Sequence, residues 1–94
     1  MFVAIICHDK PNHLDLRMKT RPTHLAYIEN SKAKLTYAGP LLTDNGETPI
    51  GSLFVGEFES LDAARAFNTN DPYSLAGLFE KVSVYPTRKV FPAT

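Results

Sequence analysis

The stretch "KLTYAGPLLTDNGETPIGSLFVGEF", residues 34–58, decides the fold of this chain. Two runs rich in β-forming residues flank a turn cluster built around Asn45-Gly46. Gly39-Pro40 interrupts the first run, which favours an edge strand or a bulge because proline cannot donate to a strand ladder. The stretch therefore predicts two consecutive strands in the middle of the chain.

A strand and a helix are expected before this pair. "MFVAIIC", residues 1–7, is a continuous apolar run, typical of a central strand buried on both faces. Residues 13–33 follow with helical spacing, although Pro22 means that the helix kinks there or that a new one begins. The expected apolar stripe of this helix is Leu14, Met18, Leu25 and Ile28.

A second helix and a last strand are expected after the pair. "SLDAARAF", residues 60–67, starts with the good N-cap Ser60 and has Asp62 in its first turn. Residues 78–91 contain the last strand, ending near Pro86. The order β-α-β-β-α-β predicts a ferredoxin-like α+β fold, in which two helices cover one face of a four-stranded antiparallel sheet.

The second face of this sheet needs a cover as well. The strand in residues 50–58 has apolar side chains on both of its faces, so neither face is clearly wet. A second copy of the chain is the natural cover. We therefore expect a homodimer through the sheet face, an arrangement of the dimeric α+β barrel type.

Composition narrows the class of protein. The 94 residues indicate one domain, residues 1–94, and the formal net charge of zero argues against a nucleic-acid partner. The single cysteine, Cys7, excludes an intrachain disulfide and favours a reducing compartment. No apolar run approaches the roughly 20 residues of a membrane helix, so we expect a cytoplasmic protein without a membrane partner.

Three polar residues of the first helix are candidates for a site. Arg17, Arg21 and His24 form a ridge beside the expected apolar stripe, with Arg21 almost inside it. Arginines in such positions often bury their stems while the charged heads reach water. A lone helical histidine is more often a packed residue than a catalyst, but an imidazole exchanges protons near neutral pH.

Asp71 is the candidate partner of His24. It sits in "NTNDPYSLAGLF", residues 68–79, directly before a proline. As a turn residue it would bond to nearby backbone amides. As a carboxylate at the exit of the second helix, it would lie in the same layer as the first helix and could orient the histidine.

The remaining polar features give weaker signals. Gly39 and Gly51 permit a close backbone approach or a bulge, and Ser52 is able to donate a hydrogen bond into a pocket. No phosphate-binding loop, nucleophile elbow or RNA-recognition motif is present. We expect no metal and no cofactor, because three possible ligands lack the spacing of a recognised site: His8, Asp9 and His13.

Several segments in sequence order resemble the YciI-like (YCII-related) family. They span almost the whole chain and are "RPTHLAYI", "YAGPLL", "DNGETPIGSLFV", "SLDAARAF" and "NDPYSLAGLFEKVSVYP". The resemblance implies a ferredoxin-like α+β fold and homodimers in which two sheets pack face to face. This agrees with the apolar pattern of the third strand.

The resemblance also implies a site. The family's histidine and aspartate, proposed as an active-site pair, match His24 and Asp71, and its G-S and G-P steps match Gly51-Ser52 and Gly39-Pro40. One relative eliminates chloride from a chlorinated hydroxyquinol. Most relatives have no established activity, so catalysis is implied and a substrate is not.

These observations lead to one expected function and one alternative. We expect a small homodimeric enzyme, a lyase or isomerase, that uses His24 and Asp71 for acid/base chemistry on a small oxygenated metabolite, aromatic or lactone-like. The alternative is a binding or accessory module of the same fold without turnover. The substrate-binding residues expected in both cases are Arg17, Arg21, Gly39, Ser52 and Tyr73.

Overall fold

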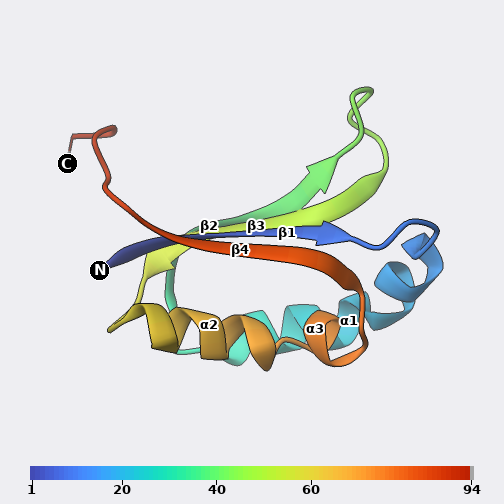
Figure 1. Cartoon of the computed structure of the whole chain (residues 1–94), viewed down its shortest axis with the longest axis horizontal. Helices are drawn as coiled ribbons and strands as arrows, with labels where there is room; N and C mark the ends of the chain where they lie inside the picture. Colours follow the sequence, from blue (N-terminus) through green and yellow to red (C-terminus); the bar gives the residue numbers. More distant parts are fainter. Residues whose placement is uncertain (94) are drawn as a thin grey trace.

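A computed structural model describes residues 1–93 as a four-stranded sheet with helices on one face (Figure 1). The predicted β-α-β-β-α-β order is confirmed, with one additional helical turn before the last strand. The strands lie in the order β2-β3-β1-β4, and every neighbouring pair is antiparallel. The elements are β1 (Phe2–Asp9), α1 (Leu14–Asn30), β2 (Lys34–Leu42), β3 (Pro49–Glu57), α2 (Leu61–Thr69), α3 (Pro72–Leu75) and β4 (Phe79–Thr87).

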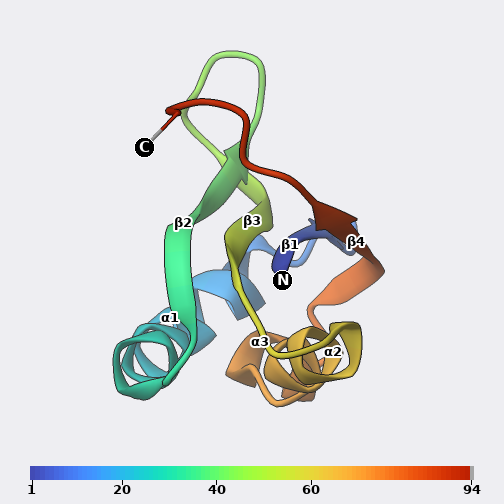
Figure 2. The same cartoon turned by 90° about the vertical axis from the view of Figure 1, so that its left-hand side faces the viewer.

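The helices and the sheet form two layers. α1 and α2 run side by side beneath one face of the sheet, and none of the helices in residues 1–93 covers the other face (Figure 2). The β2–β3 hairpin and the segment after β4 both rise on the uncovered side (Figure 1). Of the helices within residues 1–93, none is both long and apolar enough to cross a membrane.

The central and edge positions of the strands follow their sequences. β1 is central, as predicted, and its alternate residues Val3, Ile5 and Cys7 are fully buried under the helices. The residues between them face the uncovered side and are half-buried in a single chain. β2, which contains Pro40, is an edge strand, as its proline predicted.

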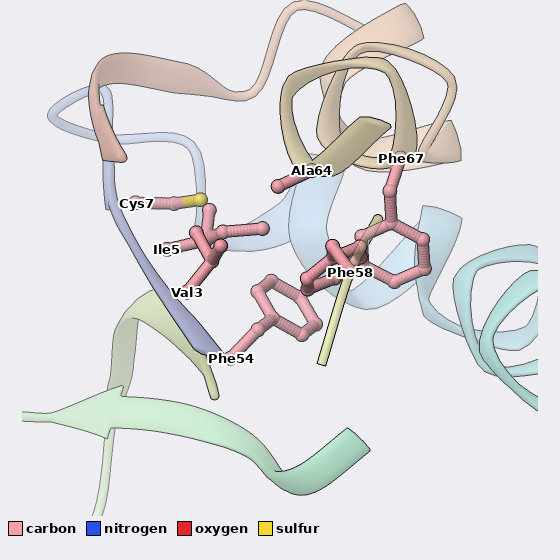
Figure 3. Close-up of a cluster of buried hydrophobic side chains, with 7 residues drawn as sticks. All are labelled: Val3, Ile5, Cys7, Phe54, Phe58, Ala64 and Phe67. Atoms are coloured by element: carbon pink, nitrogen blue, oxygen red, sulfur yellow. The ribbon is translucent and has the colours of Figure 1, made fainter. Parts of the chain in front are cut away.

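The hydrophobic core lies between β1, β3 and α2 (Figure 3). Phe54 from β3 stands edge-on to Phe67 from α2, with ring centroids 5.8 Å apart. The predicted N-cap of α2 is present, because the Ser60 hydroxyl accepts from the Ala63 amide at 3.0 Å. The space between α2 and the sheet is therefore filled by a conventional apolar core.

The face that α1 turns to the sheet differs from the predicted apolar stripe. Three residues of that stripe are 41–51% exposed, whereas the buried residues of α1 are Arg17 and His24. The buried face is rotated by roughly a quarter turn from the stripe at 100° per residue. The prediction of the buried face was wrong because polar contacts of Arg17 and His24 hold α1 against the rest of the protein. The exposed members of the predicted stripe are Leu14, Met18 and Leu25.

Two further expectations concern Pro22 and Arg21. The helix runs from Leu14 to Asn30 with Pro22 inside it, so of the two alternatives for Pro22 the start of a new helix is excluded. Pro22 is exposed, and its ring lies on the water side. Arg21, expected almost inside the buried stripe, is exposed as well.

Candidate active site

His24 and Asp71 form a buried hydrogen-bonded pair. The imidazole Nδ1 lies 2.8 Å from Asp71 Oδ1 and 3.0 Å from Oδ2. His24 is 8% exposed and Asp71 is fully buried. Because a carboxylate only accepts, Nδ1 carries the hydrogen and donates it. This arrangement leaves Nε2 as the ring nitrogen that is available to a ligand.

The local sequence explains the position of Asp71. It is the N-cap of α3, with Pro72 in the first turn, and its Oδ1 also accepts from the Tyr73 amide at 2.9 Å. The two sequence interpretations of Asp71 therefore hold together, because it both caps a turn and contacts His24. The sequence did not predict that the turn becomes a short helix, which packs against α1.

Tyr73 stands between the two buried polar residues of α1. Its ring stacks on His24 at 3.9 Å between centroids, with 14° between the planes. The Arg17 guanidinium carbon lies 4.6 Å from the centroid of the same ring. Residues seven apart on a helix are two turns apart, so one ring fits between them. Burial raises the pKa of the Tyr73 phenol, and the positive charges of Arg17 and Arg21 oppose that rise.

Arg17 is fixed by β1 and β3. Its Nε donates to Asp9 Oδ2 at 2.6 Å, and its Nη2 donates to Asp9 Oδ1 at 3.0 Å and to Ser52 Oγ at 2.8 Å. The side chains of Arg17 and Asp9 are 5% and 7% exposed. The expectation of a buried stem with its head in water is therefore wrong, because the head finds a buried carboxylate.

These residues surround a cavity of about 290 Å³ between α1, β2 and β3. The cavity has largely apolar walls, and Asp71 lies behind His24 rather than on its surface. Among its lining residues are most of the residues expected from the sequence: Arg17, Arg21, His24, Gly39, Ser52 and Tyr73. Its apolar walls include Met18, Leu25, Ile28 and Phe54.

Asp9 is the site residue that the sequence prediction missed. The sequence suggests it only as a metal ligand with His8 and His13, yet the strand pattern before it also indicates its direction. The alternation that turns Ile5 and Cys7 to the helices also turns Asp9 there. Within residues 1–93, no group of three potential metal-binding side chains comes together.

A larger cavity of about 550 Å³ lies elsewhere, near Met1 and along α2. Phe58 and Phe67 form part of its wall, and its charged residues are exposed lysines and glutamates. No histidine, cysteine or buried aspartate lines it. Size alone therefore does not identify the candidate site, because the buried arginine and histidine line the smaller cavity.

The fold and this cavity define a ferredoxin-like α+β protein with a buried histidine–aspartate pair. The YCII-related domain model matches residues 1–88. The chain belongs to this family. It is 40% identical to Protein YciI of Escherichia coli O6:H1 over 98 aligned residues, which cover 97% of this chain and 100% of the relative. An uncharacterised protein of Haemophilus influenzae is 37% identical over 98 aligned residues, which again cover 97% of this chain and 100% of the relative.

Solved structures give the same fold. The 5-chloro-2-hydroxyhydroquinone dehydrochlorinase TftG of Burkholderia phenoliruptrix AC1100, in complex with 2,5-dihydroxybenzoquinone, matches with a TM-score of 0.88 and 35% identity over 94% of each chain. An antibiotic biosynthesis monooxygenase matches with a TM-score of 0.59 and 11% identity, covering 96% of this chain and 99% of the other. The second likeness concerns the fold alone.

Proposed function

We propose that this protein is a cofactor-independent acid/base enzyme, a lyase or isomerase, acting on a small oxygenated metabolite. The observation that carries the proposal is the 2.8 Å contact of His24 Nδ1 with buried Asp71, at the wall of a cavity of about 290 Å³. Asp71 orients the imidazole and stabilises the positive charge that forms when Nε2 accepts a proton. A flat hydroxylated ring suits the stacked and apolar walls.

The dehydrochlorinase neighbour supports elimination from a hydroxylated ring. For a chlorinated hydroxyquinol, the balance requires two proton movements. One proton moves from a hydroxyl oxygen to the ring carbon that bears chlorine. A second hydroxyl then loses its proton while the C–Cl bond breaks and chloride leaves with its electron pair. We propose that His24 Nε2 carries these protons, and that hydroxyls of Ser52 and Tyr73 donate to the oxygen that gains charge.

Chloride release tests this function. Purified protein is incubated with 5-chloro-2-hydroxyhydroquinone, and free chloride is measured for the wild type and for His24→Gln. We expect release by the wild type and a loss of about 10²–10⁴-fold in the variant. The matched control is Thr23→Ala, an exposed position next in sequence to His24. If 2,5-dihydroxybenzoquinone stabilises both proteins alike and no substrate of this class is converted, the binding module without turnover is the correct function.

We further propose that the working form is a cytoplasmic homodimer joined through the uncovered sheet face. Tyr37 and Tyr85 are 52% and 58% exposed on that face, and Phe91 after β4 is 84% exposed. The hairpin and the segment after β4 rise around it (Figure 1). Sedimentation should show a dimer at micromolar concentration, weakened by Leu53→Lys on this face and unchanged by the exposed Ala66→Lys on α2. A monomer throughout would contradict this proposal.

A further inference from the structure

Most donors of the Arg17 head already have partners, and among residues 1–93 only Nη1 has none. The Asp9 carboxylate takes hydrogens from Nε and Nη2 at 2.6 and 3.0 Å, which is a bidentate pair. The second hydrogen of Nη2 goes to Ser52. A fork that binds a carboxylate needs two neighbouring nitrogens, and Nη2 belongs to both such pairs of a guanidinium. No open fork therefore faces the cavity from Arg17.

The same contacts fix the direction of the Ser52 hydroxyl. A guanidinium donates and never accepts, so Ser52 Oγ must accept the hydrogen of Arg17 Nη2 at 2.8 Å. The hydroxyl's own hydrogen then points away from Arg17, and within residues 1–93 no side chain or backbone oxygen takes it. Ser52 is 3% exposed and lines the cavity. The cavity therefore receives one neutral O–H donor at this wall.

We propose that Asp9 is a specificity-determining residue of this cavity, because it makes the wall a neutral hydroxyl donor rather than a cationic fork. The ligand class that fits is a molecule with an uncharged carbonyl oxygen, such as a quinone, a lactone or an amide, which accepts from Ser52 beside His24. A carboxylate finds no two neighbouring guanidinium nitrogens free to bind it there, because Nη2 is already shared between Asp9 and Ser52. The inference rests on the proposed function for the identity of the cavity, but the selectivity is a binding property that needs no turnover.

Arg21 is the other cation of the cavity and acts differently. It is exposed, so its charge is solvated and attracts anions only weakly. Its contribution is the same whether Asp9 is present or not. A comparison between variants at Asp9 therefore isolates the effect of the buried pair.

Benzamide and benzoate are suitable probes because they have the same size and differ in charge. Each is titrated into full-length protein, and its affinity is taken from amide shift changes around Ser52. We expect wild type to bind benzamide at least as tightly as benzoate. Asp9→Asn removes the negative charge and one of the two acceptor oxygens, so the Arg17 charge is uncompensated and the affinity ratio of benzoate to benzamide should rise by about tenfold or more.

Two companion variants keep the test decisive if the uncompensated charge of Asp9→Asn prevents folding. Ser52→Ala leaves the Arg17–Asp9 pair in place, and it should lower benzamide affinity about fivefold without a gain for benzoate. Asp9→Asn combined with Arg17→Met removes both charges and should keep the wild-type ratio.

An unchanged ratio in folded Asp9→Asn would overturn the inference. So would a tenfold preference of wild type for benzoate, no loss of benzamide affinity in Ser52→Ala, or no shift change with either probe. Chloride release that depends on His24 is measured separately. The proposed activity can therefore fail while the selectivity holds, and the reverse is equally visible.

Discussion

The two long helices contact the same sheet face in different ways. α2 buries Ala64 and Phe67 in a conventional apolar core, with one asparagine beside them. α1 buries an arginine and a histidine, each held by a carboxylate from another element. Charged groups are rarely buried without partners, so the burial of this face of α1 depends on the carboxylates of Asp9 and Asp71. The difference separates a helix that stabilises the fold from a helix that forms the wall of the candidate site.

Asp71→Asn should have the largest effect, and on activity alone. Asparagine is also a good N-cap, so α3 should remain folded. Its amide no longer requires the hydrogen on His24 Nδ1, so the imidazole loses its fixed tautomer and the support of a negative charge. We expect turnover of the chlorinated hydroxyquinol to fall about 10²–10⁴-fold. Equal activity in a correctly folded variant would show that α1 does not build a proton-transfer site.

Phe67→Ala tests the other helix. The Phe67 side chain is 8% exposed and contacts the rings of Phe54 and Tyr27. Its removal should lower the free energy of unfolding by about 3–5 kcal/mol in urea titrations. The control is Arg65→Ala on the exposed side of α2, where the pair with Asp62 at 3.6 Å is solvated and the change should stay within about 0.5 kcal/mol. A similar loss in both variants would contradict the assignment of α2 to the core.

Cys7 is buried in the core, where Asn68 of α2 contacts it and the charges of Arg17 and Asp71 act on its thiol. Its substitution should have a smaller effect on the free energy of unfolding, and that effect depends on pH. Burial raises the pKa of its thiol from 9.0 to about 12, and the Asn68 amide, 3.3 Å from Sγ, partly opposes this rise. Between these values the folded protein keeps a proton that the unfolded chain has lost, so stability falls as pH rises.

Chemical denaturation from pH 8 to pH 11 measures this effect. The free energy of unfolding of Cys7→Ala should fall less steeply with pH above about 9 than that of the wild type. Part of the slope should remain in the variant, because burial also raises the pKa values of Tyr27 and Tyr73. Parallel curves for the two proteins would contradict a buried, protonated thiol.

The fold was predictable from local patterns. The central hairpin, the apolar run of β1 and the Ser60 cap each indicated their element without knowledge of the rest of the chain. The same is true of the edge position of the strand with Pro40. These features depend on spacing and turn chemistry, which a single sequence displays.

The site was predictable only in part. His24 and Asp71 were identified as candidates, but their 2.8 Å contact joins residues 47 positions apart, which no local pattern specifies. The buried face of α1 was missed because a helical periodicity of apolar residues cannot reveal a face held by ion pairs. Asp9 was missed for the same reason, since its role depends on Arg17 from another element.

Nitrogen NMR of the His24 side chain is the most direct test of its role as the base that faces the cavity. In the neutral imidazole we expect the hydrogen on Nδ1, bonded to Asp71, and none on Nε2, and Nε2 alone should respond strongly when 2,5-dihydroxybenzoquinone is added. In Asp71→Asn this preference should be lost. A wild-type imidazole with its hydrogen on Nε2, or one that ignores the ligand, would contradict the assignment of His24 as the pocket-facing base.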